Sequence, residues 1–359
     1  MEQVKSPKNY EKEKIIIKIL TTFIHIILLS IFIWIFKTHN LIFSRHYTLN
    51  FILTFSIFFI VDKIFSFPLS LYGSYFIEKK YQLSNQTLSE FLKDHLKITL
   101  LSYVIENFLL LVIFFFMKYT SFWWIYAFLF SLIVIIFFSE FASVIFIPIF
   151  YKLEKIEDTE LIEMLKKLCE KVNIKIENLY KIKFSEKTKT ANAMFTGLGK
   201  KKKVILSDTL LENYSHSEIK TIIAHELGHY YYKHIHLLII LQSVLLFCAF
   251  FLLNFILKET SIKIYDVRNI FIFILFIELF FLFFTPIINI ISRFMERVAD
   301  KFAIRLTNDK KSFISALKKL AKQNLANEEP HPLIEFLFYS HPPIKKRIKY
   351  LEKLNFSKQ

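Results

Sequence analysis

The sequence is poor in the residues that cross-link small domains and shape tight turns. Its 359 residues include four glycines and two cysteines, Cys169 and Cys248. Two cysteines cannot build a disulfide framework, and they leave no cysteine-based zinc site. The chain also lacks internal repeats, low-complexity domains and any recognisable nucleic-acid-binding module. These absences exclude disulfide-rich scaffolds, repeat proteins and cysteine-type zinc modules.

Hydrophobic residues are abundant instead. They make up 54% of the chain, 43 residues are Phe, and the mean hydropathy is +0.41. A soluble domain of this size is less apolar. The net charge of +16 would suit a nucleic acid or an anionic membrane surface. Because the basic residues fall between apolar runs, we predict a polytopic α-helical membrane protein whose partner is the lipid bilayer and not a nucleic acid.

Six apolar runs are long enough to cross a bilayer at about 1.5 Å per residue. Pro68 is expected to end the second run, and a polar loop, 78–97, to precede the third. The first run lacks a small-residue cleavage site and is interpreted as an anchor rather than a signal peptide. Four runs lie in an N-terminal membrane domain, 1–150, and two lie in the remainder, 151–359. The expected spans are 15–36, 49–67, 98–117, 122–149, 235–257 and 269–291.

Lysine placement predicts the orientation in the membrane. Six spans put both termini on one side, together with the 78–97 loop and the polar segment 151–234. These parts are rich in lysine, whereas the loops on the opposite side carry few basic residues. By the positive-inside rule, the lysine-rich side is cytoplasmic.

Several predicted spans contain ionisable residues. Each of these residues alone is explained by pairing between helices, or by a side chain that reaches toward the interface. Together they predict a hydrated interior among the helices. The residues are His25, Asp62, Lys63, Glu106, Glu140 and Glu278.

The segment 151–234 contains the pattern H-E-x-x-H, formed by His225, Glu226 and His229. On an α-helix the two histidines lie one turn apart on one face, so both imidazoles can bind one metal ion. Glu226 then lies beside that face, where a carboxylate can act as general base toward a water molecule. This arrangement is typical of zinc hydrolases. The pattern is short, so chance matches occur.

A third ligand is available after the last span. If that span continues as a helix, Glu296 and Asp300 share one of its faces, and Arg293 lies one turn before Glu296. Glu296 would complete a His2Glu site with an open fourth position, and Asp300 would orient a ligand histidine or donate a proton. For an isolated E-x-x-x-D pattern, an ordinary solvated helix face is the better explanation. The preceding span and the H-E-x-x-H pattern favour the metal site.

Two β-prone runs upstream of H-E-x-x-H, around Asn192 and 204–208, flank a lysine-rich turn that contains Gly197 and Gly199. They predict a β-hairpin whose edge could pair with an extended peptide. A plain structural hairpin is the alternative. Gly228, between the two histidines, is expected to allow another segment to approach the helix closely.

Three further histidines lie near these motifs. His341 precedes two prolines and a basic helix, and it could donate a hydrogen bond to an oxyanion. A loop histidine without a role is the alternative. His234 and His236 follow H-E-x-x-H, but His234 does not match the helical phase of the motif. Both are interpreted as interfacial residues at the start of the fifth span and not as ligands.

These motifs together resemble the M48 zinc metallopeptidases, and within that family the CaaX prenyl protease 1 (Ste24-type) branch. The similarity extends over residues 50–350. It rests on His225-Glu226-Leu-Gly-His229, Glu296 with Asp300, Asn192-Ala-Met-Phe-Thr-Gly197, the 204–208 run, Ser340-His341-Pro342, and the 72–87 segment followed by Phe91, Asp94 and Lys97.

The resemblance implies a membrane-embedded zinc endopeptidase with a cytoplasmic, zincin-like α+β catalytic domain that contains a small β-hairpin or sheet. It implies one Zn²⁺ per chain, bound by His225, His229 and Glu296, and it makes Glu226 the general base. Asp300 is then the accessory acid. Asn192 and His341 match positions that contact substrate, which in this branch is a peptide with a prenylated C-terminal Cys-aliphatic-aliphatic-any sequence.

The chain departs from the branch in two respects. The branch typically has seven spans where six are expected here, and Gln82-Leu83 replaces the usual Gly-Phe. The compact form favours a prokaryotic inner membrane, with the ER membrane expected in a eukaryote, and prenylated substrates cannot be assumed. Two alternatives remain, an HtpX-like quality-control protease and a non-enzymatic membrane scaffold with a vestigial zinc site.

Overall fold

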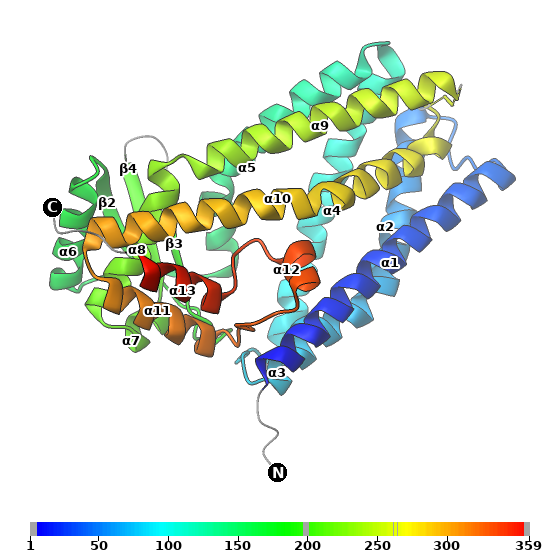
Figure 1. Cartoon of the computed structure of the whole chain (residues 1–359). Coiled ribbons are helices and arrows are strands. Elements are labelled where there is room, and N and C mark those ends of the chain that lie inside the picture. Colours follow the sequence, from blue (N-terminus) through cyan, green and yellow to red (C-terminus); the bar gives the residue numbers. More distant parts are fainter. Residues whose placement is uncertain (1–5, 197–200, 261, 264, 355–359) are drawn as a thin grey trace.

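The computed structural model describes residues 6–196, 201–260, 262–263 and 265–354. Within this part of the chain, six helices are long and apolar enough to cross a membrane. Figure 1 shows them extending to one side of the region that contains the sheet. They confirm the expected helical membrane architecture with six spans. The helices are α1 (Pro7–His39), α2 (Tyr47–Leu71), α4 (Leu88–Tyr119), α5 (Trp123–Phe150), α9 (His234–Glu259) and α10 (Ile270–Thr307).

The prediction that Pro68 ends the second span is wrong. Pro68 lies inside α2, which continues through a π-helical turn (Tyr72–Phe76) into α3 (Ile77–Lys80). A proline removes one backbone donor, and neighbouring groups or a local π adjustment can accommodate that loss in a membrane helix. The helix therefore passes through Pro68 and reaches the π-helical turn four residues later.

The predicted polar loop, 78–97, is also shorter in the structure. Only 81–87 lies between α3 and α4, because α4 begins at Leu88. The side chain of Thr87 accepts a hydrogen bond from the backbone N–H of Glu90, and the Glu90 carboxylate accepts one from the Thr87 N–H. This capping box starts the helix well before its apolar part. The charged residues that looked like a loop therefore form the first turns of α4.

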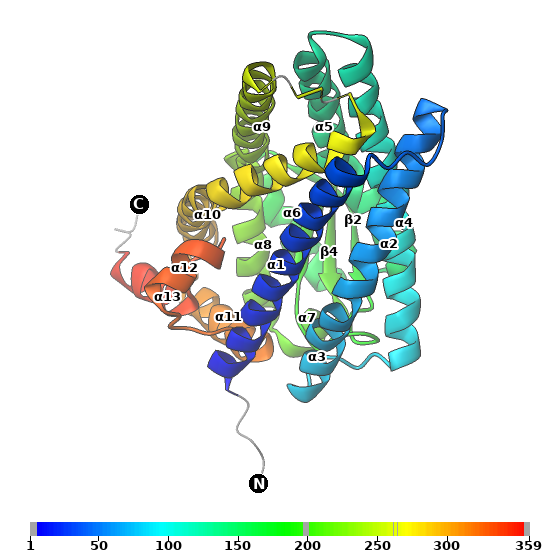
Figure 2. The same cartoon turned by 90° about the vertical axis from the view of Figure 1, so that its right-hand side faces the viewer.

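Ionisable side chains within the spans pair with one another. His25 of α1 lies 2.7 Å from Asp62 of α2 and 3.4 Å from Glu278 of α10, and Lys63 lies 3.2 Å from Asp62. Pairing between helices, one of the two explanations for such residues, therefore applies to His25, Asp62 and Glu278, whereas Lys63 pairs within α2. At the far end of the bundle, Tyr47 donates a hydrogen bond to the backbone oxygen of Tyr265. Figure 2 shows α9 on one side of the bundle and α2 and α4 on the other.

The region between α5 and α9 builds a four-stranded sheet from β1 (Leu153–Lys155), β2 (Lys175–Ile182), β3 (Ala193–Thr196) and β4 (Lys201–Ser207). The strand order is β1-β2-β4-β3, with β2 and β4 parallel and β3 and β4 antiparallel. The predicted hairpin is thus confirmed, although its turn, with Gly197 and Gly199, lies outside the described residues. Strand β3 forms one edge of the sheet, beside α8.

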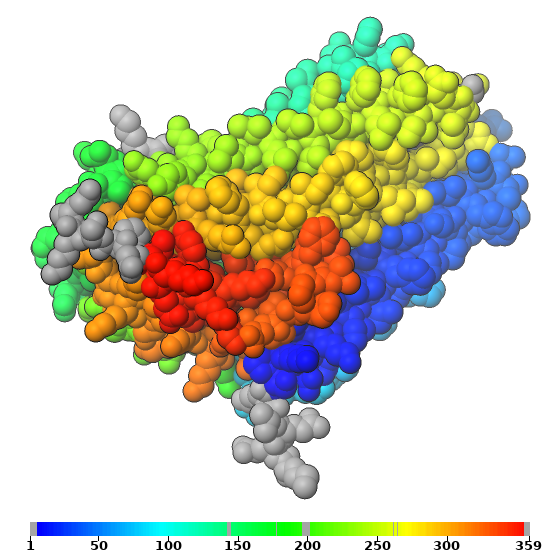
Figure 3. Space-filling view, viewed as in Figure 1, coloured from blue at the N-terminus to red at the C-terminus, as the bar shows by residue number. Residues whose placement is uncertain are grey.

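Helices cover this sheet and form the core of the catalytic region. Helix α8 packs against β3, α6, α10 and α11. The C-terminal helices α12 and α13 lie against α10, where Figure 3 shows them on the surface. The remaining helices are α6 (Thr159–Glu170), α7 (Asp208–Asn213), α8 (His216–Tyr231), α11 (Lys310–Gln323), α12 (Pro332–Phe338) and α13 (Ile344–Lys353).

Gly228 sets how closely α8 approaches α10. A Cβ atom at Gly228 would lie 3.0 Å from the Ala299 Cα and 3.2 Å from the Phe302 ring. Both contacts are shorter than ordinary van der Waals separations, and the first one involves backbone that cannot move away easily. The expectation that a small residue here admits a neighbouring segment is confirmed, and that segment is α10.

Candidate metal centre

Helix α8 carries the H-E-x-x-H pattern and has a firmly fixed start. Ser215 and Glu218 form a capping box, which satisfies two of the free N–H groups of the first turn. The Glu218 carboxylate also accepts hydrogen bonds from Ser315 and Lys319 of α11, both at 2.7 Å. The helix that presents the histidines is therefore anchored to α11 at its N-terminal end.

The two histidines of α8 and Glu296 of α10 converge on one point. The Nε2 atoms of His225 and His229 are 3.2 Å apart. Glu296 lies 3.3 Å from the His225 Nε2 through one oxygen and 3.1 Å from the His229 Nε2 through the other. The three residues form the one group of this kind found among the described residues. The structure therefore brings together the three residues that were expected to bind a metal.

These separations fit a tetrahedral ion. Bonds of about 2.0 Å at tetrahedral angles place neighbouring ligand atoms about 3.3 Å apart, close to the three distances here. The Glu296 Oε2 atom is buried and receives no hydrogen bond of good geometry. Its cationic neighbours are the His225 Nε2, at 3.3 Å, and the Arg347 Nη1, at 3.8 Å. A buried carboxylate that is only loosely paired gains from a bound cation. Two imidazoles and a carboxylate are also ligands that Zn²⁺ prefers.

The electrostatics favour positive charge at this point. Burial alone would disfavour a protonated His225, but contacts with Asp300 and Glu296 outweigh burial and raise the pKa of His225 to about 10. Two acidic side chains thus surround the imidazole with little solvent to screen them. A cation bound by His225, His229 and Glu296 would offset the negative charge of these two acidic side chains.

Asp300 holds the other side of His225. Its Oδ1 lies 2.9 Å from the His225 Nδ1, and its two oxygens accept hydrogen bonds from the Arg347 Nη2 at 2.5 Å and Nε at 2.9 Å. Asp300 is fully buried, and Arg347 is 9% exposed. The charge of the carboxylate is therefore balanced by a fork of two parallel hydrogen bonds.

Arg347 was not identified as a site residue from the sequence. The sequence feature that could have revealed it is its position on α13. There Arg347 lies on the same helix face as Ile344, Ile348 and Leu351. An arginine on the apolar face of an amphipathic helix has to find a buried acidic partner. Here that partner is Asp300.

His234 has a different environment from the one predicted. It begins α9, as expected, but it is 4% exposed, and its Nδ1 lies 3.0 Å from the Nδ1 of His229. Lys233 has φ 53° and ψ 38°, a left-handed conformation that ends α8. The helical phase of α8 therefore cannot be extended to His234. His236 is exposed, as an interfacial residue would be.

His341 approaches the site from the C-terminal segment. Its Nδ1 lies 2.9 Å from the Oε1 of Glu296, and its side chain is 64% exposed. Arg293 of α10 donates hydrogen bonds to the backbone oxygens of Glu335, at 3.0 Å, and Tyr339, at 2.5 Å. These bonds fix the end of α12 just before His341.

The other two predicted site residues lie on the same helix or beside it. Glu226 is partly exposed between the two histidines of α8. Asn192 is exposed directly before β3, and its backbone N–H donates to the Ser207 Oγ at 3.0 Å. Because β3 packs on α8, Asn192 begins the sheet edge beside the helix that carries the histidines.

Comparisons with known proteins agree with this geometry. Residues 155–355 match the model of peptidase family M48, and residues 1–152 match that of the CAAX prenyl protease N-terminal region, described as five membrane helices. The described part of 1–152 contains four long membrane helices.

Similar individual proteins come from distant organisms. The uncharacterized metalloprotease YhfN of Bacillus subtilis is 28% identical over 305 residues, which cover 82% of this chain and 71% of that protein. CAAX prenyl protease 1 of Saccharomyces cerevisiae is 29% identical over 324 residues, covering 81% and 70%.

The fold matches a solved structure of the same group. The crystal structure of S. mikatae Ste24p superposes with a TM-score of 0.83 at 23% identity, over 96% of this chain and 88% of that one. This superposition shows a shared fold. The family model that matches residues 155–355 shows that the chain belongs to peptidase family M48, and with the match over residues 1–152 it is an integral membrane metallopeptidase of the Ste24 type.

Proposed function

We propose that this chain is a zinc endopeptidase in which His225, His229 and Glu296 hold one Zn²⁺. The observation that carries the proposal is the convergence of these three donors at 3.1–3.3 Å beside a glutamate on the same helix. When bound, zinc supplies a Lewis acid that polarises water and the scissile carbonyl. Glu226 takes the proton from the attacking water and delivers it to the leaving amine.

The surrounding residues position the substrate and the ligands. A peptide paired along the free edge of β3 would lie beside α8, with Asn192 at one end of the paired segment. His341 donates a hydrogen bond to the developing oxyanion, since its ring is exposed and reaches the Glu296 carboxylate. Asp300 orients His225 and is itself held by Arg347.

His234 is proposed to do for His229 what Asp300 does for His225. A zinc-binding His229 Nε2 must be free of its proton, so its Nδ1 carries the proton and donates a hydrogen bond to the Nδ1 of His234, 3.0 Å away. In this arrangement the His234 Nδ1 is unprotonated and accepts the hydrogen bond.

The membrane side and the substrate class are further proposals. We place the zinc site on the cytoplasmic side, because the N-terminus and the 151–234 segment are rich in lysine. The two regions are taken as 1–150 and 151–359. The names of the relatives favour C-terminal processing of prenylated or membrane-associated peptides of the CaaX type, and the membrane helices next to the site support a substrate delivered from the bilayer.

Replacing Glu226 with Gln removes the general base without changing the size of the side chain. The expected result is a fall in kcat/KM of about 10²–10⁴-fold for a cleavable peptide. Zinc content, measured by atomic absorption, should stay at one ion per chain because Glu226 is not a ligand. Unchanged peptide cleavage would rule out the mechanism.

Replacing His234 with Ala should weaken zinc binding about 10–100-fold, because His229 loses the partner that fixes its tautomer. Competition with a chelator measures this affinity on the purified protein. His236→Ala is the matched control, since His236 is two residues away and exposed, and it should leave zinc affinity unchanged. Equal effects of the two substitutions would contradict the role given to His234.

The substrate class is tested with one peptide in two forms. A farnesylated peptide ending in a CaaX sequence should have a higher kcat/KM than the same peptide without the lipid, since the site adjoins membrane helices. Initial rates in detergent micelles measure the difference. Equal rates would be consistent with the proposed endopeptidase activity but would reject a preference for prenylated substrates.

The orientation is tested by labelling in sealed cells. A cysteine introduced at the exposed Lys166 of α6 should react with a membrane-impermeant maleimide only after the membrane is opened. A cysteine at the exposed Phe122, between α4 and α5, should react in intact cells. The reverse pattern would place the zinc site outside the cytoplasm.

A further inference from the structure

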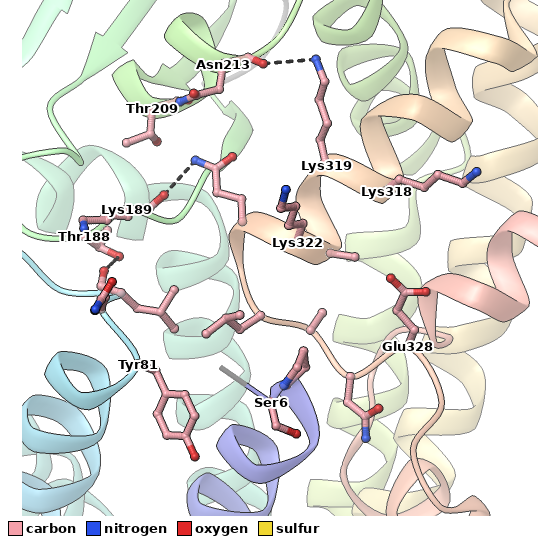
Figure 4. A pocket seen from close by; sticks show the side chains of 18 of the residues that line it. Ser6, Tyr81, Thr188, Lys189, Thr209, Asn213, Lys318, Lys319, Lys322 and Glu328 are labelled. Carbon is pink, nitrogen blue, oxygen red and sulfur yellow. Dashed lines mark hydrogen bonds between the residues drawn. The ribbon is translucent and has the colours of Figure 1, made fainter. Parts of the chain in front are cut away.

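A large cavity of the described structure lies outside the metal centre. Its volume is about 1360 Å³, and it opens between the start of α1, the turn 81–85, the segment 185–189, α7 and the end of α11. Figure 4 shows Lys318, Lys319 and Lys322 extending from α11 on one wall, with Thr188, Lys189, Thr209 and Asn213 on another. None of these residues contacts the metal centre, although Lys319 also anchors α8 through Glu218.

Cationic side chains without partners predominate in this cavity. Among the described residues, Lys8, Lys189, Lys318 and Lys322 line it and form no ion pair, whereas Lys319 pairs with Glu218. On the acidic side, Glu329 is already paired with Lys345. That leaves four free ammonium groups against the two free carboxylates of Glu212 and Glu328. The cavity therefore favours an anionic ligand.

One wall of the cavity leads directly to the proposed substrate edge. Lys189 lines the cavity, and Asn192, three residues later, precedes β3. Three extended residues span at most about 11 Å. Helix α11 holds this connection in place, because Gln323 donates to the Lys189 oxygen at 2.8 Å and the Asn324 Oδ1 accepts from the Ala191 N–H at 3.2 Å.

The cavity also lies away from the hydrocarbon core. Pro7, at its edge, is eight residues before Ile15, where the apolar run of α1 begins. Eight helical residues extend about 12 Å. A ligand in the cavity is thus in contact with water and polar side chains such as Asn85, rather than with lipid chains.

We propose that this cavity is an exosite for a carboxylate-bearing segment of the peptide substrate. The proposal rests on the peptidase function and on the β3 edge as the place where substrate binds. A peptide that continues past Asn192 enters the cavity within a few residues, where its carboxylates meet Lys189, Lys318 and Lys322. The cavity thus selects substrates by the charge of a segment remote from the cleaved bond.

Charge reversal at two lysines tests the proposal on the full chain in detergent. Three peptides share one cleaved sequence and carry two Glu, two Gln or two Lys at the ends of otherwise identical flanks. In Lys318→Glu/Lys322→Glu the KM for the acidic peptide should rise about tenfold at unchanged kcat. The neutral peptide should be unaffected, and added salt should raise the wild-type KM for the acidic peptide.

A matched control separates the cavity from overall charge. Lys166→Glu/Lys171→Glu makes the same change in charge on the exposed face of α6, and it should leave the KM for every peptide unchanged. If both double variants raise the KM for the acidic peptide equally, the effect belongs to net charge and the exosite is rejected.

Binding separates this proposal from the proposed function. A fluorescent acidic peptide is titrated onto the Glu226→Gln protein, with and without the Lys318→Glu/Lys322→Glu change, and its anisotropy is followed. Weaker binding to the lysine variant supports the exosite even if no peptide is cleaved by the wild type, a result that would reject only the peptidase function. Equal binding overturns the exosite. Binding of phosphatidylglycerol vesicles that depends on the two lysines, with peptide binding unaffected, would also overturn it in favour of a lipid site.

Discussion

The close approach of α8 and α10 is the contact on which the metal centre depends. The two histidines come from one helix and Glu296 from the other, and their donor atoms lie 3.1–3.3 Å apart. At position 228 a glycine permits this approach, since a Cβ there would lie 3.0 Å from the Ala299 Cα. One of the four glycines of the chain is thus placed where the two halves of the site meet.

A buried charge network fixes the same contact from the other side. Asp300 lies one turn after Glu296, contacts His225 and accepts two hydrogen bonds from Arg347. Removing one member of such a buried pair typically costs about 3–5 kcal/mol, because the remaining charge is left without a partner. Arg347 therefore ties the C-terminal helix α13 to the metal centre, and α13 in turn follows the loop that carries His341.

The membrane helices and the catalytic region are joined by a continuous helix and by direct hydrogen bonds, so the spans are more than an anchor for an attached enzyme. Helix α10 begins in the spans, where Glu278 lies 3.4 Å from His25, and continues to the proposed metal ligand Glu296. At the other end of α1, Glu11 accepts a hydrogen bond from Asn327 at 2.6 Å and another from Tyr339, two residues before His341. The position of a span can therefore affect the position of a site residue.

The sequence by itself determined the class of the protein, the six spans and the three candidate metal ligands, because each depends on local pattern. The length of an apolar run predicts a membrane span, and the i, i+4 spacing of His225 and His229 predicts that both lie on one helix face. Element boundaries at Pro68 and 78–97 were wrong, since a membrane helix tolerates a proline and charged turns can extend a span beyond the bilayer.

Only the tertiary structure decided which residues support the ligands. Arg347 contacts Asp300 from 47 positions further along the chain, and no local pattern records a pairing at that separation. His234 begins α9, as predicted, but it is buried beside His229 instead of lying at the interface. Contacts made by chain reversal and by packing between distant helices depend on the whole fold. For this reason the sequence predicted the candidate ligands but not the residues that orient them.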